Sequence, residues 1–354
     1  MNSFRILEGD KSTLNIDIPI DGLQIQRACS IIKMHGITKL WISNECLSVV
    51  ESLNFLTNFL GVTPEILEVS LLGRFCDLNN LYVFNNLEYL SCDVINEEKV
   101  DLSRFTKLKK LSTSRLESFI NLSASHLQAL HFYGYFEPYP RPKLNPELLS
   151  QLKHLRSLNL SHHVIDFTFE DVTELDNLER VIIVQCNIKN LNGIEKFHKI
   201  RYVDVGYCYS LSDISAIKEL PNLAWLNLGP CPRIKNLDDI VNNKSLRALC
   251  LESYKNVDIE KIRSLKELQF LYLDNCNPIP SIKFIDDLKN MLGLLILGTK
   301  IIDGDITPAL KLKNVGITAM RHYNLDVDDP NLFPPHEQKY SYAYWTNLDN
   351  ILNS

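Results

Sequence analysis

Long hydrophobic runs are absent from this 354-residue sequence. No stretch of about 18 consecutive apolar residues occurs, so the sequence predicts no membrane-spanning helix and no membrane partner. The opening residues, MNSFRILEGDKSTLNIDIPIDG, lack the charged region and the apolar region that make up a signal peptide. These two absences lead us to expect a cytoplasmic protein.

Positive charge is also scarce. The sequence has 37 Lys and Arg against 43 Asp and Glu, for a net charge of -6. A protein that coats nucleic acid normally needs a basic surface, so this balance argues against a nucleic-acid partner and leaves room for a basic protein partner. Hydrophobic residues make up 45% and charged residues 23%, which is typical of a folded globular protein.

Catalytic motifs are missing as well. The sequence contains no G-x-x-x-x-G-K-[ST], G-x-G-x-x-G, G-x-S-x-G or H-E-x-x-H. His162 and His163 are adjacent, so at a strand end they would point apart. Cys250 would need a neighbouring base to act as a nucleophile, and the sequence supplies no obvious one. We therefore expect no enzymatic activity, no cofactor and no small-molecule substrate.

A repeat of the form L-x-x-L-x-L fills most of the chain. The steps between successive units are 23, 22, 23, 23, 22 and 24 residues, and such regularity over this length indicates a repeat architecture. A further unit is expected at Val315-Thr318-Met320, and weaker units precede the regular ones. The regular units start at Leu155, Leu178, Ile200, Leu223, Leu246, Leu268 and Leu292, and the weaker ones at Ile37, Ile66, Leu87, Leu108 and Leu127.

One step is longer than the others. Leu127 and Leu155 are 28 residues apart, and the excess contains the proline-rich residues 134–142. Proline cannot donate a backbone hydrogen bond to a sheet ladder, so clustered prolines exclude a strand there. The sequence thus predicts an inserted loop near residues 134–150.

Cysteines recur three residues after the last apolar position of a unit. One cysteine per unit, without partner histidines, argues against a metal site, and the same spacing argues against disulfides. We interpret these residues as a structural ladder in which each side chain satisfies backbone groups of a neighbouring turn. The ladder cysteines are Cys186, Cys208, Cys231 and Cys276.

With its units of 22 to 23 residues and the pattern L-x-x-L-x-L-x-x-C-x-I-x-x-L, the chain resembles leucine-rich-repeat proteins of the internalin and phosphatase-regulator class. The resemblance implies an α/β solenoid, or horseshoe, with a parallel β-sheet on the concave face and short helices or turns on the convex face. It further implies an N-terminal cap at residues 1–36, repeats at 37–320, and a C-terminal cap or aromatic tail at 321–354. The unit at Leu292 places Lys300 at the ladder position, so we expect the ladder to end there.

Side chains between the apolar positions of each unit should face the concave surface, because strand side chains alternate between the two faces. Aromatic and acidic residues gather there. Trp225 in particular should be exposed, so that Trp225→Ala would weaken binding with little loss of stability. The candidate partner-binding residues are Tyr133, Tyr202, Asp204, Trp225, Asn227, Glu252, Phe270, Tyr272 and Asp274.

These features predict a non-enzymatic scaffold that binds a basic protein on its concave face. The most specific reading is a bacterial immunity protein that neutralises a toxin, because the chain is freestanding, cytoplasmic and acidic-aromatic on one face, and toxin nucleases tend to be basic. Residues 321–324 (RHYN) also resemble a histidine-tyrosine near the end of some bacterial repeat proteins that are encoded beside toxins. The alternative is a regulatory or adaptor subunit that binds a cellular enzyme such as a phosphatase. Aromatic residues at 340–345 are expected either to cap the last coil or to reach the partner.

Overall fold

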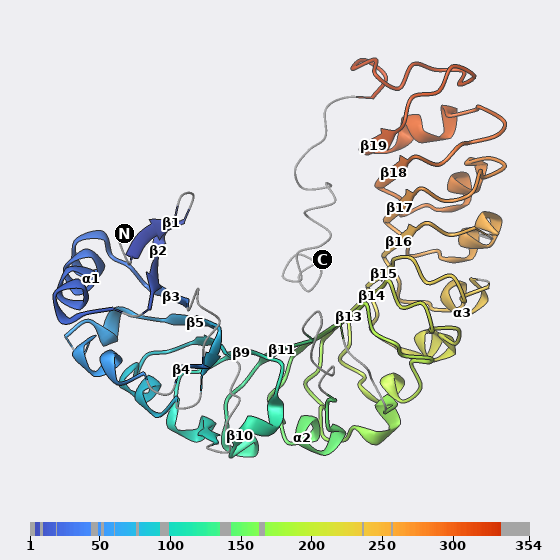
Figure 1. Cartoon of the computed structure of the whole chain (residues 1–354). Helices are drawn as coiled ribbons and strands as arrows, with labels where there is room; N and C mark the ends of the chain where they lie inside the picture. Colours follow the sequence, from blue (N-terminus) through green and yellow to red (C-terminus); the bar gives the residue numbers. More distant parts are fainter. Residues whose placement is uncertain are drawn as a thin grey trace. The chain divides into compact units, whose positions relative to one another are not determined.

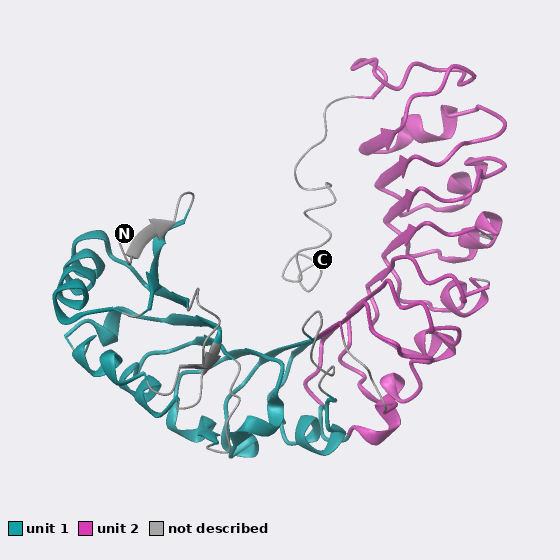
Figure 2. Ribbon diagram, in the orientation of Figure 1, with its two compact units in different colours: residues 1–159, 173–175 teal, residues 160–172, 176–354 magenta. Residues whose placement is uncertain are grey.

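The computed structural model describes residues 4–7, 10–18, 20–43, 49–50, 53–59, 61–75, 78–92, 99–134, 143–162, 167–235, 237–255 and 258–333. The chain divides into two compact units (Figure 2). Unit 1 comprises residues 1–159 and 173–175, and unit 2 comprises residues 160–172 and 176–354.

Unit 1 begins with two antiparallel strands and a helix. Strand β1 (Phe4–Leu7) pairs with β2 (Asp10–Asp17), and β2 pairs in parallel with β3 (Lys39–Ser43). Between β2 and β3 lies α1 (Gly22–His35), whose first turn is fixed by a capping box between Asp21 and Gln24. The helix ends at Gly36 in the left-handed conformation, with φ of 62°, which glycine adopts without steric cost.

Parallel strands continue the sheet of unit 1. After β3 the hydrogen-bonded order is β5, β7, β9, β11 and β12, and β12 contains the boundary between the units. Two short pairs, β4 with β6 and β8 with β10, lie outside this sheet. The remaining elements up to β12 are β4 (Val49–Val50), η1 (Asn54–Phe59), η2 (Thr63–Glu65), β5 (Glu68–Leu72), β6 (Arg74–Phe75), η3 (Asn79–Val83), β7 (Tyr89–Ser91), β8 (Val100–Asp101), η4 (Leu102–Arg104), β9 (Lys110–Thr113), η5 (Leu116–Ser118), β10 (Phe119–Ile120), η6 (Leu122–Ala124), β11 (Ala129–Tyr133), α2 (Pro146–Ser150) and β12 (Ser157–Ser161).

Unit 2 repeats a strand and a short helical turn. Its strands β13 to β19 are parallel neighbours in chain order. The helical turns of unit 2 all lie on one side of this row of strands (Figure 1). Its elements are η7 (Phe169–Asp171), β13 (Arg180–Val184), η8 (Ile194–Lys196), β14 (Tyr202–Gly206), η9 (Ser215–Glu219), β15 (Trp225–Leu228), α3 (Asp238–Val241), β16 (Ala248–Glu252), η10 (Ile259–Ser264), β17 (Phe270–Asp274), η11 (Lys283–Asp287), β18 (Gly293–Leu297), η12 (Thr307–Lys311) and β19 (Asn314–Ile317).

The repeated leucines form the core between the strands and the turns. Leu223, Leu226 and Leu228 are fully buried, and the corresponding positions of the units from Ile37 to Leu268 are buried in the same way. Burial of one apolar face of every strand against the turns is what holds successive coils together. The prediction of a repeat solenoid with a parallel sheet and short helical turns is confirmed.

The predicted register is wrong for the last two units. In β18 the buried positions are Leu294 and Ile296, which pair with Leu271 and Leu273, while Leu297 is exposed. The sequence LGLLILG is apolar on both sides of the pleat, so its periodicity does not fix the inward set. A shift of one residue moves every side chain to the other face.

Because of this one-residue shift in register, the ladder position of this unit is Thr299 and not Lys300. Thr299 is fully buried, and its Oγ1 accepts a hydrogen bond from Cys276 N at 2.9 Å. Lys300 is exposed. In the following unit the strand is β19, which ends at Ile317, so the inward residue there is Ile317 and not Met320 as the predicted unit requires. The ladder therefore continues one coil beyond the expected end.

Candidate binding face of unit 2

Outward side chains of β13 to β18 form rows that run across the strands. The strand register pairs Tyr202 with Trp225, Trp225 with Ala248, and Ala248 with Phe270. These residues define row 1, and the residues two positions later in each strand define row 2. Row 1 is Arg180, Tyr202, Trp225, Ala248, Phe270 and Gly293; row 2 is Ile182, Asp204, Asn227, Cys250, Tyr272 and Leu295.

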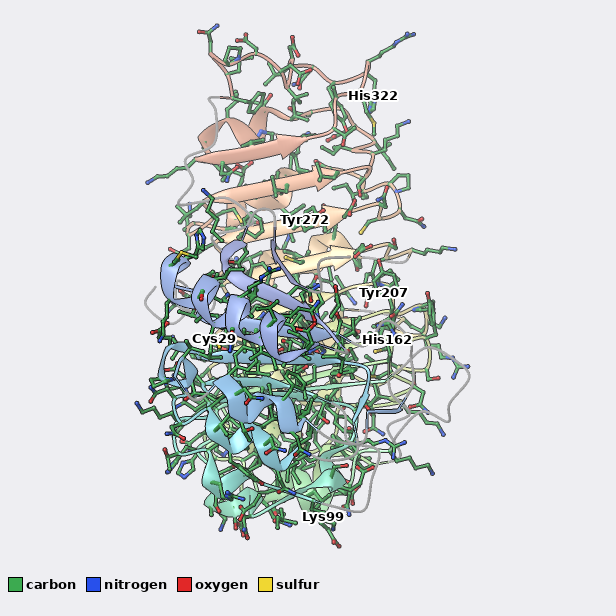
Figure 3. The ribbon with its side chains drawn as sticks, turned by 60° about the vertical axis from the view of Figure 1, so that its left-hand side comes forward. Cys29, Lys99, His162, Tyr207, Tyr272 and His322 are labelled. Carbon is green, nitrogen blue, oxygen red and sulfur yellow. The ribbon has the colours of Figure 1, made fainter. Side chains whose placement is uncertain are left out.

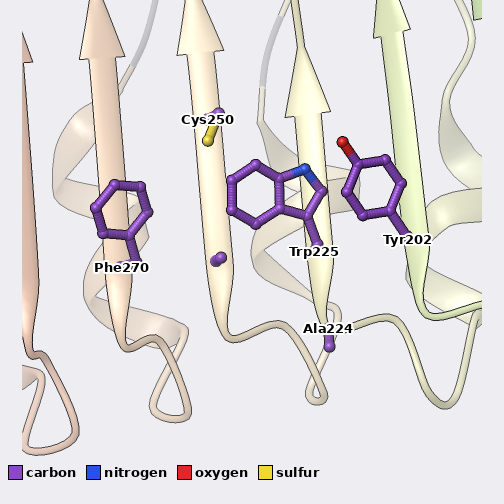
Figure 4. Close-up of a cluster of buried hydrophobic side chains, with 6 residues drawn as sticks. Tyr202, Ala224, Trp225, Cys250 and Phe270 are labelled. Carbon is purple, nitrogen blue, oxygen red and sulfur yellow. The ribbon is translucent and has the colours of Figure 1, made fainter. Parts of the chain in front are cut away.

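The aromatic residues of row 1 are buried, which contradicts the predicted exposure of Trp225. Trp225 and Phe270 are 0% exposed and Tyr202 is 3% exposed. The ring of Trp225 is parallel to that of Tyr202, with centroids 5.7 Å apart, and lies 6.4 Å from that of Phe270 (Figure 4). The small side chain of Ala248 lies between the strands that carry Trp225 and Phe270. The predicted position of Trp225 in the strand is right, but the residue belongs to a hydrophobic cluster.

Polar side chains of row 2 are hydrogen-bonded to each other beside this cluster. Asp204 accepts hydrogen bonds from Asn227 Nδ2 at 2.9 Å and from the Tyr202 hydroxyl at 3.4 Å. The Arg180 guanidinium lies 4.3 Å from the centre of the Tyr202 ring. Burial raises the pKa of the Asp204 carboxyl, against the opposing effect of these hydrogen bonds. Asp204 and Asn227 therefore orient each other and leave little of either group to bind a partner.

Two carboxylates end the neighbouring strands β16 and β17. Glu252 and Asp274 are directly paired in the register and are both half-buried. Asn275 Nδ2 donates a hydrogen bond to Asp274 at 2.8 Å. Neither carboxylate forms an ion pair with any of the described residues. The two adjacent negative charges are thus available to a cation.

Tyr207 lies beside Glu252, one of these two carboxylates, on the other side of β15. Tyr207, labelled in Figure 3, follows the end of β14. Its hydroxyl donates a hydrogen bond to Glu252 Oε1 at 3.3 Å. Gly229 follows the last residue of β15, Leu228, and a Cβ at Gly229 would come within 3.0 Å of the Gly206 Cα. The two glycines leave the space that lets Tyr207 reach Glu252. The charge of Glu252 raises the pKa of Tyr207.

Sequence reasoning missed the two most accessible aromatic residues of this region. Tyr207 is 39% exposed and Tyr209 is 62% exposed. Tyr207 has a φ of 56°, the left-handed conformation that recurs in Gln185, Ser253 and Asn275 just after the other strands. The alternation rule applies only within a strand, so it gave no direction for a side chain in the following turn. The recurring 22- to 23-residue spacing of this turn position was the available signal.

The remaining candidate, Tyr133, lies elsewhere. It is a half-buried residue of β11 in unit 1, and its ring lies 5.4 Å from that of His131. The other eight candidates all belong to unit 2, on β14 to β17.

The predicted cysteine ladder lies behind the sheet. Cys186 Sγ donates to the Leu160 and Val184 carbonyls at 3.5 and 3.4 Å, and Cys208 and Cys276 make equivalent contacts. Tyr254 takes the same position in the unit between Cys231 and Cys276 and is buried. The thiols thus satisfy strand-end carbonyls. Among the described residues no group of three or more His, Cys, Asp or Glu is placed to hold a metal ion.

Two other sequence features have structural roles. Burial raises the pKa of Cys250 well above its usual range, so this thiol stays protonated and is a poor nucleophile.

In the RHYN segment, His322 Nε2 lies 2.7 Å from the Ile301 carbonyl oxygen, and the Tyr323 hydroxyl accepts a hydrogen bond from Ile301 N at 3.3 Å. Asn324 Oδ1 accepts from Ile306 N at 3.0 Å. RHYN therefore closes the last coil by satisfying its backbone groups.

Some predicted features fall outside the described residues. These are His163, most of the inserted loop, at 135–142, and the aromatic residues at 340–345. Within the described part of the chain, every helix is too short or too polar to cross a bilayer.

The sequence matches no protein-family model and no curated protein. The structure is similar to an internalin (inlF) from Listeria monocytogenes, with 17% identity, a TM-score of 0.52, and coverage of 84% of this chain and 88% of the other. It also matches the functional domain of InlJ from Listeria monocytogenes, with 16% identity, a TM-score of 0.46, and coverage of 80% and 64%. At such identities the similarity to inlF establishes the fold alone. Together with the repeats and the buried leucine pattern, it shows that this protein has the leucine-rich-repeat fold.

Proposed function

We propose that the protein is a non-enzymatic scaffold that binds one basic protein at the acidic edge of unit 2. We define the acidic edge as Tyr207, Tyr209, Glu252, Tyr272 and Asp274. The edge keeps three of the predicted binding residues and adds the two exposed tyrosines. The row 1 residues Tyr202, Trp225 and Phe270 would support this surface from the side and would not make the main contacts.

The pairing of Glu252 with Asp274 is the observation that carries the proposal. Like charges on directly opposed positions of neighbouring strands destabilise a sheet. Here the two acidic residues are register partners on strands about 4.8 Å apart, and neither forms an ion pair with the described residues. A lysine or arginine of a partner would relieve this repulsion and gain charge-assisted hydrogen bonds.

The tyrosines would supply the apolar part of the contact. Tyr209 is 62% exposed, and Tyr207 is held beside the carboxylates by its bond to Glu252. Tyrosine rings attract cations over their faces and are enriched among residues that dominate binding energy. An arginine could therefore contact a carboxylate and a ring together.

The most specific form of this proposal is an immunity protein that neutralises a toxin. An acidic edge suits a basic toxin such as a nuclease, because complementary charge speeds association. The alternative is a regulatory or adaptor subunit of a cellular enzyme such as a phosphatase. RHYN does not favour either form, since its contacts within the last coil account for it.

The test compares charge-neutral variants in affinity capture from the native host. We expect Glu252→Gln with Asp274→Asn to lose the partner that the unaltered protein captures, and the binding of that purified partner to weaken at least about tenfold. Glu219→Gln with Glu267→Gln is the matched control, because it removes the same charge from exposed positions outside the strand face. Equal binding by both double variants would refute the acidic edge as the binding site.

The captured partner then separates the two forms. An immunity protein should abolish the toxicity of the purified partner when the two are co-expressed. A regulatory subunit should change the substrate choice of an enzyme and leave its activity intact. Capture of a nucleic acid or an acidic protein would contradict both forms.

A further inference from the structure

Two histidines occupy the same position in neighbouring coils of unit 1. His126 and His154 each directly precede the first buried leucine of a repeat unit. Two residues further on, the Gln128 carbonyl accepts a hydrogen bond from the Arg156 amide at 2.7 Å, which holds the two coils in register. The histidines therefore lie side by side just before β11 and β12, and both are exposed.

The two imidazole rings are close enough to share one metal ion. Their centroids are 5.8 Å apart, and their planes differ by 37°. A Zn–N bond of about 2.0–2.1 Å places the centre of a coordinated imidazole about 3.2 Å from the ion. Two rings on one ion are then about 5.2 Å apart at a tetrahedral angle and about 6.4 Å apart at a linear one. The observed separation lies between these limits, and small side-chain rotations would reach the tetrahedral value.

The surroundings leave the ring nitrogens accessible. Neither ring forms a hydrogen bond with a described residue. Lys107, at the same position of the preceding coil, donates a hydrogen bond to Asn86 Oδ1 at 2.7 Å. Lys153 forms an ion pair with Glu174 Oε2 at 2.6 Å. Other residues thus hold both neighbouring ammonium groups, and a cation can approach the rings from solvent.

We propose that His126 and His154 bind one divalent transition-metal ion, of the Zn²⁺ or Cu²⁺ type. Imidazole nitrogens suit these ions, whereas Mg²⁺ and Ca²⁺ prefer oxygen ligands. The described residues place no third His, Cys, Asp or Glu beside the pair, so water completes the coordination. The site belongs to unit 1 and is independent of partner binding at the acidic edge of unit 2.

The ion links the two ends of an enlarged coil. His126 and His154 are 28 residues apart, whereas the regular units repeat every 22 to 24 residues. A link that closes a longer loop removes more conformational entropy from the open chain. Because the ion binds the closed coil and not the open one, it stabilises β11 and β12 against local opening.

The test measures Zn²⁺ binding by calorimetry in the full chain. Loss of even a supporting residue lowers the affinity of a metal site about 10- to 100-fold, so we expect His126→Gln and His154→Gln each to weaken binding at least about tenfold. His198→Gln is the matched control, because it removes an exposed histidine from the turn before β14. Cu²⁺ should bind more tightly than Zn²⁺, and Mg²⁺ should not bind. Equal Zn²⁺ affinity in all four proteins, or no Zn²⁺ binding at all, would overturn the proposal.

Two further measurements locate the ion and its effect. Electron paramagnetic resonance of bound Cu²⁺ should show two imidazole nitrogens in the unaltered protein and one in either single variant. Hydrogen exchange in β11 and β12 should slow when Zn²⁺ is added to the unaltered protein and stay unchanged in His154→Gln. A nitrogen count that neither variant changes would place the ion elsewhere, and exchange that bound Zn²⁺ leaves unaltered would refute the link between the coil ends.

Discussion

The ring planes of Tyr202 and Trp225 are 3° apart, with centroids separated by 5.7 Å. The two residues are direct register partners on β14 and β15 and are both buried. Their contact is a packing contact on the outward face of the sheet, in addition to the core formed by the inward leucines. Unit 2 therefore buries apolar side chains on both sides of β14 to β17.

This arrangement predicts a large effect of Trp225→Ala on stability. Removal of a fully buried tryptophan side chain should lower the free energy of unfolding by about 3–5 kcal/mol, through lost burial and the cavity left beside Tyr202. Urea unfolding followed by circular dichroism measures the change. Tyr209→Ala is the control, because that side chain is 62% exposed and its loss should cost less than about 0.5 kcal/mol. Equal stability of the two variants would contradict the buried position of Trp225.

The sequence was sufficient for the fold because the inward set of each strand is local information. Leu223, Leu226 and Leu228 could be assigned from spacing, and that assignment also placed Trp225 on the outward face correctly. Its burial could not be predicted in the same way, because the exposure of an outward side chain depends on what packs over the sheet. Tyr207 was missed for a different reason, since its direction is set by a left-handed turn residue and not by strand alternation.

The Asp204 carboxyl should make stability depend on pH. Burial raises its folded-state pKa above the ordinary value of 3.8. In the window just above 3.8 the folded protein then binds more protons than the unfolded chain, so this group lowers stability as the pH rises. Asp204→Asn should therefore gain stability relative to the unaltered protein at pH 7 and lose that gain below pH 3.8.

Asp213 provides the opposite case within the same unit. Hydrogen bonds from Ser215 lower the pKa of its carboxyl, so ionisation of Asp213 contributes stability that is present above 3.8 and lost at lower pH. Asp213→Asn should lose stability at pH 7 and not in acid. Urea unfolding curves from pH 3 to 7 compare both variants, and changes of the same sign would contradict the burial of Asp204.

Gly193 should tolerate no side chain. It has a φ of 91°, and a Cβ would lie 2.2 Å from the backbone nitrogen of Glu170 in the preceding coil. Gly193→Ala must move one coil against the next, so we expect a loss of at least about 3 kcal/mol in unfolding free energy. Gly22 is the matched control, because a Cβ at this first residue of α1 meets nothing within 4 Å. Gly22→Ala should raise stability by about 0.4–1 kcal/mol.

Thr299 tests the register of β18. If the ladder continues through Thr299, its replacement by valine keeps the volume but leaves the buried Cys276 N–H without the acceptor at 2.9 Å. We expect Thr299→Val to cost about 1–3 kcal/mol and Thr299→Ser to retain most of the stability. Lys300→Ala should be nearly neutral because Lys300 is exposed. The sequence-based register instead puts Lys300 at the ladder position and ends the ladder there, so it gives Thr299 no such role. Thermal and urea unfolding of the three variants therefore decide which residue faces the core, because a shift of one residue exchanges the two faces of the strand.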